Sequence, residues 1–121
     1  MNNEKKYEPD LRFAIAIHAD LDEIEVSSVL RKIFPDFTKI TEAALRESRN
    51  MLVLETSDLY DQNKINEKDG WLYYKYELSV FPMVDSTLEY QRNLACMILK
   101  RIKSIGLLAE IICDDDFFET I

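Results

Sequence analysis

The chain has 121 residues, of which 47% are hydrophobic, with only 2 Gly and 3 Pro. That length suits a single domain over residues 1–121, and the composition excludes a disordered or low-complexity protein. The formal net charge of −8 argues against nucleic acid as a partner, because phosphates would repel the chain, and favours encounter with a basic protein.

We expect no secretion signal and no membrane contact. The apolar run near the start is interrupted by His18 and Asp20, and no small-residue cleavage site follows it. No stretch of the sequence is long and apolar enough to cross a bilayer. Cys96 and Cys113 belong to no Cys-x-x-Cys pair, so reduced thiols in a cytoplasmic protein are expected.

The chain opens with a predicted strand and helix. Residues 11–18 form a short apolar run of strand-forming residues. Asp20 and Glu23 then have the spacing of a capping box, in which each side chain accepts a free N–H group of the first helical turn. Apolar residues recur at helical spacing over 26–33, and Pro35 ends the predicted helix.

The middle of the chain is less uniform. Residues 36–50 are ambiguous, because EAALRE has high helix propensity whereas TKITEA alternates like a strand; we favour a helix. Residues 51–58 and 71–81 each predict a strand. The segment between them is polar and ends in Asp-Gly, so we expect a hairpin with a long tip.

The last part predicts a long helix and a final strand. Ser86 and Glu89 have capping-box spacing, and apolar positions up to Ile105 mark a helix of roughly five turns. Gly106 is well placed to end it, and residues 107–113 predict a strand.

The resulting order is strand, helix, strand, strand, helix, strand. It resembles the ferredoxin-like βαββαβ fold, and the resemblance rests on element order over nearly the whole chain. It implies an α+β domain with a four-stranded antiparallel sheet and two helices on one face. Fold alone implies no function.

The aromatic segment WLYYKYELSVF leaves three interpretations open. In a strand over 71–81, Trp71, Tyr73 and Glu77 share the face away from the helices. They could stack bases as in RNA-recognition domains, but Asp69 and the net charge argue against that. They could simply cover the sheet, or they could form a protein interface, for which Trp and Tyr are typical. The ferredoxin-like resemblance implies that this face can also form a homodimer.

The acidic C-terminal segment, residues 114–121, is also open to three interpretations: a metal site, a mobile solvated tail, or a docking surface for a basic protein. We take the third. The candidate partner-binding residues of this segment are Asp114, Asp115, Asp116, Phe117, Phe118 and Glu119. The predicted topology gathers them at one edge with Glu8, Asp10, Asp85 and Glu89, offset by Arg46 and Arg49.

No catalytic pattern is present. His18 is the only histidine and lies on a strand, and Cys96 falls in a helix at a predicted core position. The sequence has no GxSxG elbow and no phosphate-binding glycine loop. We therefore expect no enzyme activity, no cofactor and no metal.

Our main hypothesis is an acidic protein-binding module that docks on a basic partner and neutralises it. In size, acidity and lack of catalytic residues the chain resembles the immunity proteins that protect bacteria from toxins, many of which are basic nucleases. The alternative is a ferredoxin-like dimeric small-molecule-binding or sensor domain, or a degradative enzyme of that fold, with a pocket around His18, Tyr73 and Lys75. A third interpretation is a subunit of a larger assembly.

Overall fold

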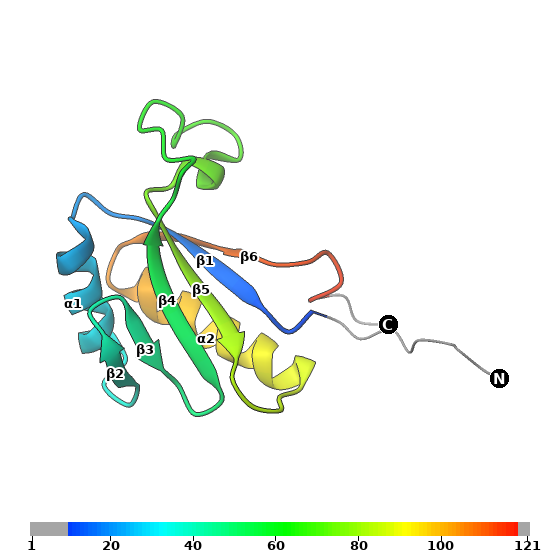
Figure 1. The fold of residues 1–121 in the computed structure, drawn as a ribbon. Coiled ribbons are helices and arrows are strands. Elements are labelled where there is room, and N and C mark those ends of the chain that lie inside the picture. Colours follow the sequence, from blue (N-terminus) through cyan, green and yellow to red (C-terminus); the bar gives the residue numbers. More distant parts are fainter. Residues whose placement is uncertain (1–9, 119–121) are drawn as a thin grey trace.

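The computed structural model describes residues 10–118. Within that range the chain is an α+β domain with a six-stranded antiparallel sheet and two α-helices (Figure 1). The strand order is β2-β3-β4-β5-β1-β6. The sequence predicted four strands, and the two additional strands form the β2–β3 hairpin. In chain order the elements are β1 (Phe13–His18), α1 (Glu23–Ile33), β2 (Thr38–Thr41), β3 (Ala44–Arg46), β4 (Asn50–Thr56), the short 3₁₀ helix η1 (Gly70–Tyr73), β5 (Tyr76–Pro82), α2 (Leu88–Ser104) and β6 (Leu108–Ile112).

Strand β1 lies between β5 and β6, which are distant from it in sequence. Ile15 of β1 is opposite Leu78 of β5 and Ile111 of β6. Strands β4 and β5 pair as the long-tipped hairpin that the sequence predicts. The register therefore aligns side chains from four strands, β4, β5, β1 and β6, that the sequence keeps apart.

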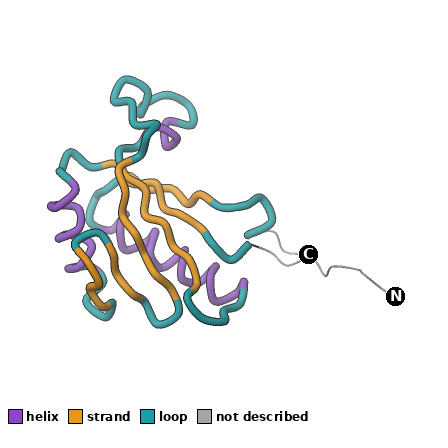
Figure 2. The backbone as a smooth tube through the Cα atoms, in the orientation of Figure 1, coloured by secondary structure: helices purple, strands orange, loops and turns teal. Residues whose placement is uncertain are grey.

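The hydrophobic core lies between the sheet and the helices; in the view of Figure 2, α2 runs behind the sheet and α1 lies at its left side. Helix α1 contacts β4, and α2 contacts β1 and β6. Alternate side chains of β1, β4 and β5 enter this layer, as the two-residue repeat of a strand requires, whereas all four residues of β2 are exposed. The largest fully buried side chains include Tyr76, Phe34, Phe117, Ile15, Ile17, Leu52, Leu78, Ile98 and Ile102.

Helix α1 begins later than predicted. Its N-cap is Asp22, whose carboxylate accepts a hydrogen bond from Glu25 N at 2.8 Å, while Asp22 N donates to Glu25 Oε1 at 3.2 Å. The expected cap, Asp20, stays in the preceding turn. The carbonyl of Leu21 accepts a hydrogen bond from the Tyr76 hydroxyl. This bond holds the β1–α1 connection against β5, and the helix begins after it.

Helix α2 also has a shifted cap. Thr87, not Ser86, is the N-cap, and its hydroxyl accepts a hydrogen bond from Tyr90 N at 3.1 Å. Ser86 instead donates to Gln91 Oε1 at 2.9 Å. At the other end Gly106 has a φ of 88°, a left-handed conformation that glycine adopts at little cost, so the predicted helix end is confirmed.

A buried polar network fastens α2 to the start of β4. Asn50 Nδ2 donates to Gln91 Oε1 at 3.0 Å, and Gln91 Nε2 donates to Asn50 Oδ1 at 2.7 Å. Glu47 accepts hydrogen bonds from Asn50 Nδ2 and from the Tyr90 hydroxyl. Because each buried polar group has a partner, the network holds α2 in place instead of destabilising the core.

The helix favoured for residues 36–50 is wrong. Strands β2 and β3 and the first residue of β4 occupy this segment. Leu45 is buried opposite Leu52 of β4, whereas Ala44 and Arg46 lie on the other face. Pairing with β4 outweighs the local helix propensity of EAALRE.

Strand β5 begins later than predicted, and this changes the aromatic segment. Trp71 and Tyr73 belong to η1 and not to a strand. Asp69 has a left-handed φ of 59°, and a Cβ on Gly70 would lie 2.0 Å from the Ile65 carbonyl oxygen. This close backbone approach builds a tight turn where the aromatic residues alone predict a strand.

Candidate functional site

The face of the sheet away from the helices carries the candidate site, and we call it the open face. Its side chains are the alternate strand residues that do not enter the core. The sequence places Glu77, Ser79 and Phe81 there, and the register agrees. The open-face residues are Ala14, Ala16, His18, Ala44, Arg46, Met51, Val53, Glu55, Glu77, Ser79, Phe81, Leu108, Glu110 and Ile112.

Three carboxylates cross the open face in one row. Glu55 lies directly opposite Glu77, and Glu77 and Glu110 lie on either side of Ala16. With strands about 4.8 Å apart, the row spans roughly 14 Å. Within residues 10–118 none of the three forms a salt bridge. Like charges directly opposite each other destabilise a sheet, so fold stability does not explain this row.

Small side chains leave room above the middle of the sheet. A hollow of about 220 Å³ lies over Ala16, and a second of about 430 Å³ lies over Ala14 and Ser79. Ile112 lines both hollows, which places them end to end beside β1. The open face therefore has two adjoining hollows, with space for side chains of a partner.

The β4–β5 loop, residues 57–75, lines one side of the smaller hollow. The pairing of β4 and β5 continues into it, because Asp61 N donates to Tyr73 O at 3.2 Å. Trp71 lines the hollow, whereas the Tyr73 ring lies 5.1 Å from Lys64 Nζ. Of the two aromatic candidates, only Trp71 borders this space. The other loop residues that line it are Ser57, Leu59, Leu72 and Tyr74.

The small-molecule alternative expects a pocket around His18, Tyr73 and Lys75, and none of the three lines either of the two hollows. The His18 ring lies 6.0 Å from the Tyr60 ring and 5.7 Å from the Tyr74 ring, and its Nδ1 is buried without a hydrogen-bond partner in the described part of the chain. Lys75 Nζ also lies near Tyr60, 5.9 Å from the centre of its ring, and donates to the Leu21 carbonyl in the β1–α1 connection at 3.4 Å.

The C-terminal acidic segment is folded, not a mobile tail, as far as the structure describes it. Phe117 is fully buried, its ring lies 5.6 Å from the Phe13 ring, and its carbonyl accepts a hydrogen bond from Arg92. Phe118 is 41% exposed, and Glu119 lies outside the described residues. The turn between β6 and Phe117 consists of Cys113, Asp114, Asp115 and Asp116.

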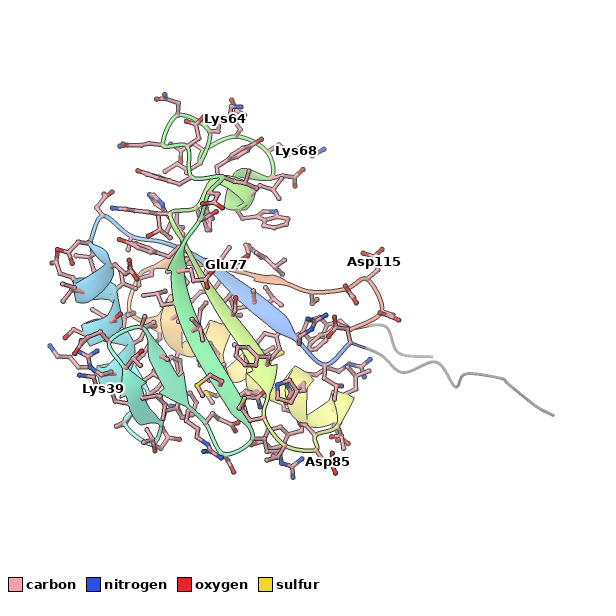
Figure 3. The ribbon with its side chains drawn as sticks, viewed as in Figure 1. Lys39, Lys64, Lys68, Glu77, Asp85 and Asp115 are labelled. Atoms are coloured by element: carbon pink, nitrogen blue, oxygen red, sulfur yellow. The ribbon has the colours of Figure 1, made fainter. Side chains whose placement is uncertain are left out.

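The acidic end is more dispersed than predicted. Arg12 donates to the two carboxylate oxygens of Asp10 at 3.0 and 2.9 Å, and this pairing lowers the pKa of Asp10. Arg12 was not among the predicted basic neighbours; of those, Arg49 stacks 4.1 Å over an aromatic ring of α2. Asp85 and Asp115 lie well apart (Figure 3). Glu8 lies outside the described residues, and among the described ones Asp85 and Asp115 do not share a single acidic edge.

The surroundings of Cys113 do not activate its thiol. Burial raises the pKa of Cys113, and the charges of Asp114 and Asp115 raise it further, which disfavours the thiolate. Cys96 is exposed on α2, which corrects its predicted core position. Within residues 10–118 no three His, Cys, Asp or Glu side chains are placed to share a metal ion. Over the same range, neither helix has the length and apolar character needed to cross a membrane.

Comparison with known proteins leaves the chain without an assigned relative. No family model, no curated protein and no solved structure matches it. The candidate site therefore rests on the residues of this chain alone.

Sequence reasoning missed two members of the carboxylate row. Glu77 was placed on the open face, but Glu55 and Glu110 were not singled out. Glu55 follows the buried Leu54 and Glu110 follows the buried Ala109, and the two-residue repeat of a strand could have placed both carboxylates on the open face. Only the register of four strands reveals that the three carboxylates form one row.

Proposed function

We propose that the chain is a protein-binding module whose open face docks on a basic partner and neutralises it. The observation that carries this proposal is the row of Glu55, Glu77 and Glu110, which lacks a counter-charge among the described residues. Lys or Arg side chains of a partner would remove the repulsion between Glu55 and Glu77. The same charges that cost stability in the free chain then contribute to binding.

Association starts with long-range attraction. The net charge of −8 steers a basic protein towards the chain, and salt weakens this steering, since charges are screened beyond about 8 Å at physiological ionic strength. Close docking then covers the two hollows, where Trp71 and Phe81 provide apolar area. Asp114 and Asp115 extend the acidic surface at the end of β6.

This mode of action is that of an inhibitor or immunity protein acting on a basic toxin or nuclease in the cytoplasm. The strand order β4-β5-β1-β6, with helices following β1 and β5, supports a ferredoxin-like arrangement to which β2 and β3 add a hairpin. Both cysteines are free, which fits a reducing compartment. The partner is defined by charge and not by this fold.

The test is affinity capture from native lysate with matched baits. We expect the wild-type chain to retain a basic protein at low salt and to release it at high salt. The partner, once purified, should lose its own activity when the chain is added. A second bait, the open-face variant, lacks the carboxylate row because it carries Glu55→Gln, Glu77→Gln and Glu110→Gln. It should not retain the basic protein.

A control variant keeps the row and removes the same amount of charge elsewhere. Its three sites are exposed and lie outside the open face, and it should behave as wild type; the changes are Asp20→Asn, Glu23→Gln and Glu67→Gln. Equal retention by all three baits would exclude the open face as the binding surface. A partner that stays fully active in the complex would exclude neutralisation.

A second candidate function, small-molecule binding, is favoured by the larger hollow. Its volume of about 430 Å³ falls within the roughly 300–1,000 Å³ of ligand pockets, and it combines Arg12 with Phe81 and Ile112. A small aromatic amine fits this chemistry, because Arg12 is already paired with Asp10 and Asp114 also lines the hollow. Such compounds should raise the melting temperature of the wild-type chain and leave that of Asp114→Asn unchanged; no shift in the wild type would dismiss this candidate.

A further inference from the structure

We propose that the smaller hollow on the open face receives an arginine side chain of the basic partner, with Glu77 as counter-charge and Trp71 and Tyr74 as aromatic walls. This inference rests on the proposed function and specifies a contact at its centre. The hollow has a volume of about 220 Å³, and Ala16 and Ile112 are among its other lining residues.

The size and lining of the hollow suit a single side chain. Its volume of about 220 Å³ is below the roughly 300–1,000 Å³ of sites for drug-sized ligands. The methyl group of Ala16 leaves depth that a longer side chain would fill. Leu59 and Leu72 also line it and are 62% and 42% exposed, so they offer apolar surface to the methylene groups of an arginine.

The charge around the hollow is negative and not already neutralised. Glu77 lines it, Glu55 lies opposite Glu77, and Glu110 lies across Ala16. The charge of Glu110 acts at the hollow, because burial first and then this carboxylate raise the pKa of Tyr74. In the described part of the chain, none of the three carboxylates has a salt bridge.

Within residues 10–118, the lysines of the loop form no salt bridge with Glu77. Lys75 Nζ donates to the Leu21 carbonyl at 3.4 Å. Lys64 Nζ lies 5.1 Å from the centre of the Tyr73 ring. Lys64 and Lys68 both lie at the far end of the loop from Glu77 (Figure 3). Among the described residues Glu77 has no salt-bridge partner, so it is open to a cation supplied by another molecule.

Arginine matches the hollow better than lysine does. The guanidinium group is planar, stacks on aromatic rings and donates two parallel hydrogen bonds to one carboxylate. Trp71 and Tyr74 supply the rings, and Glu77 supplies the carboxylate. A lysine ammonium is a compact and strongly hydrated charge that gains less from this combination.

The test uses Trp71, the only tryptophan, as a fluorescent reporter. The full chain is titrated with N-acetyl-arginine amide, with the neutral citrulline analogue and with the lysine analogue. We expect a saturable change in Trp71 emission with the arginine compound, with a dissociation constant on the order of millimolar. The citrulline compound should give no saturable change, and the lysine compound should bind several-fold more weakly.

Variants assign the effect to the hollow. Glu77→Gln should weaken arginine binding about five- to tenfold, while Glu67→Gln, which removes an exposed carboxylate of the same loop, should not change it. Amide NMR shifts at Ala16 and Ile112 provide a second readout that does not depend on the tryptophan.

Two results would overturn the arginine assignment: equal responses to arginine, citrulline and lysine, or no response by either readout. If capture of a basic protein still depends on the carboxylate row, only this inference fails and the proposed function stands. If that capture is absent as well, the proposed function fails with it.

Discussion

Phe117 and Phe13 pack with their rings 5.6 Å apart, and both side chains are buried. This contact joins the middle of the acidic segment to the first residue of β1. It holds the turn of Asp114 to Asp116 beside the larger hollow, which Asp114 itself lines. The segment that could have been a solvated tail is therefore part of the surface that we assign to binding.

Replacing Phe117 by Ala should destabilise the fold by about 3–5 kcal/mol, the usual cost of truncating a buried Phe. Phe118→Ala is the matched control, because Phe118 is the next residue in the chain and is 41% exposed. This substitution should lower the free energy of unfolding by less than about 1 kcal/mol. Urea unfolding measures both. Similar small losses in the two variants would mean that the segment is not anchored.

The shift in the start of α1 has a simple test. Asp22→Ala removes the carboxylate that caps the helix and should cost about 1 kcal/mol. Asp20→Ala changes an exposed turn residue and should stay within about 0.5 kcal/mol of wild type. If Asp20→Ala has the larger effect on the free energy of unfolding, the helix begins where the sequence predicted.

Glu47 should make stability depend on pH in the acidic range. Its burial alone would raise its pKa, but hydrogen bonds from Tyr90 and Asn50 outweigh this and hold the pKa below the ordinary value of 4.5. A carboxyl with a lower pKa in the folded than in the unfolded state stabilises the fold above the unfolded-state pKa. It loses that contribution as the pH falls through the folded-state value.

The free energy of unfolding of Glu47→Gln should therefore fall less than that of wild type between neutral pH and about pH 3. Glu67→Gln is the control, since this exposed carboxylate takes no part in the network, and it should keep the wild-type pH dependence. Parallel curves for wild type and Glu47→Gln would contradict the assignment.

Local patterns predicted the elements that carry their own signals. The strand β4, the helical spacing of α2 and the glycine at its end were predicted correctly. They failed where tertiary contacts decide the outcome. Leu45 lies in a strand because it packs opposite Leu52, and Trp71 lies in a 3₁₀ helix because Gly70 allows a tight turn against Ile65.

The candidate site was harder to predict for a related reason. An acidic run such as Asp114 to Asp116 is conspicuous in the sequence, whereas Glu55, Glu77 and Glu110 are isolated within three different strands. Their alignment depends on the register of β4, β5, β1 and β6, which no local pattern specifies. The net charge of the sequence predicted an acidic surface, but it did not predict where on the fold that surface lies.

The most direct test of the account is the association rate constant with the captured partner, measured at about 50 and 500 mM salt. The wild-type chain and the control variant should associate fast at low salt and slow down steeply as salt rises. The open-face variant should associate more slowly and respond less to salt. If it instead matches the wild-type rate at both salt concentrations, the row of Glu55, Glu77 and Glu110 does not guide binding, and the central claim is wrong.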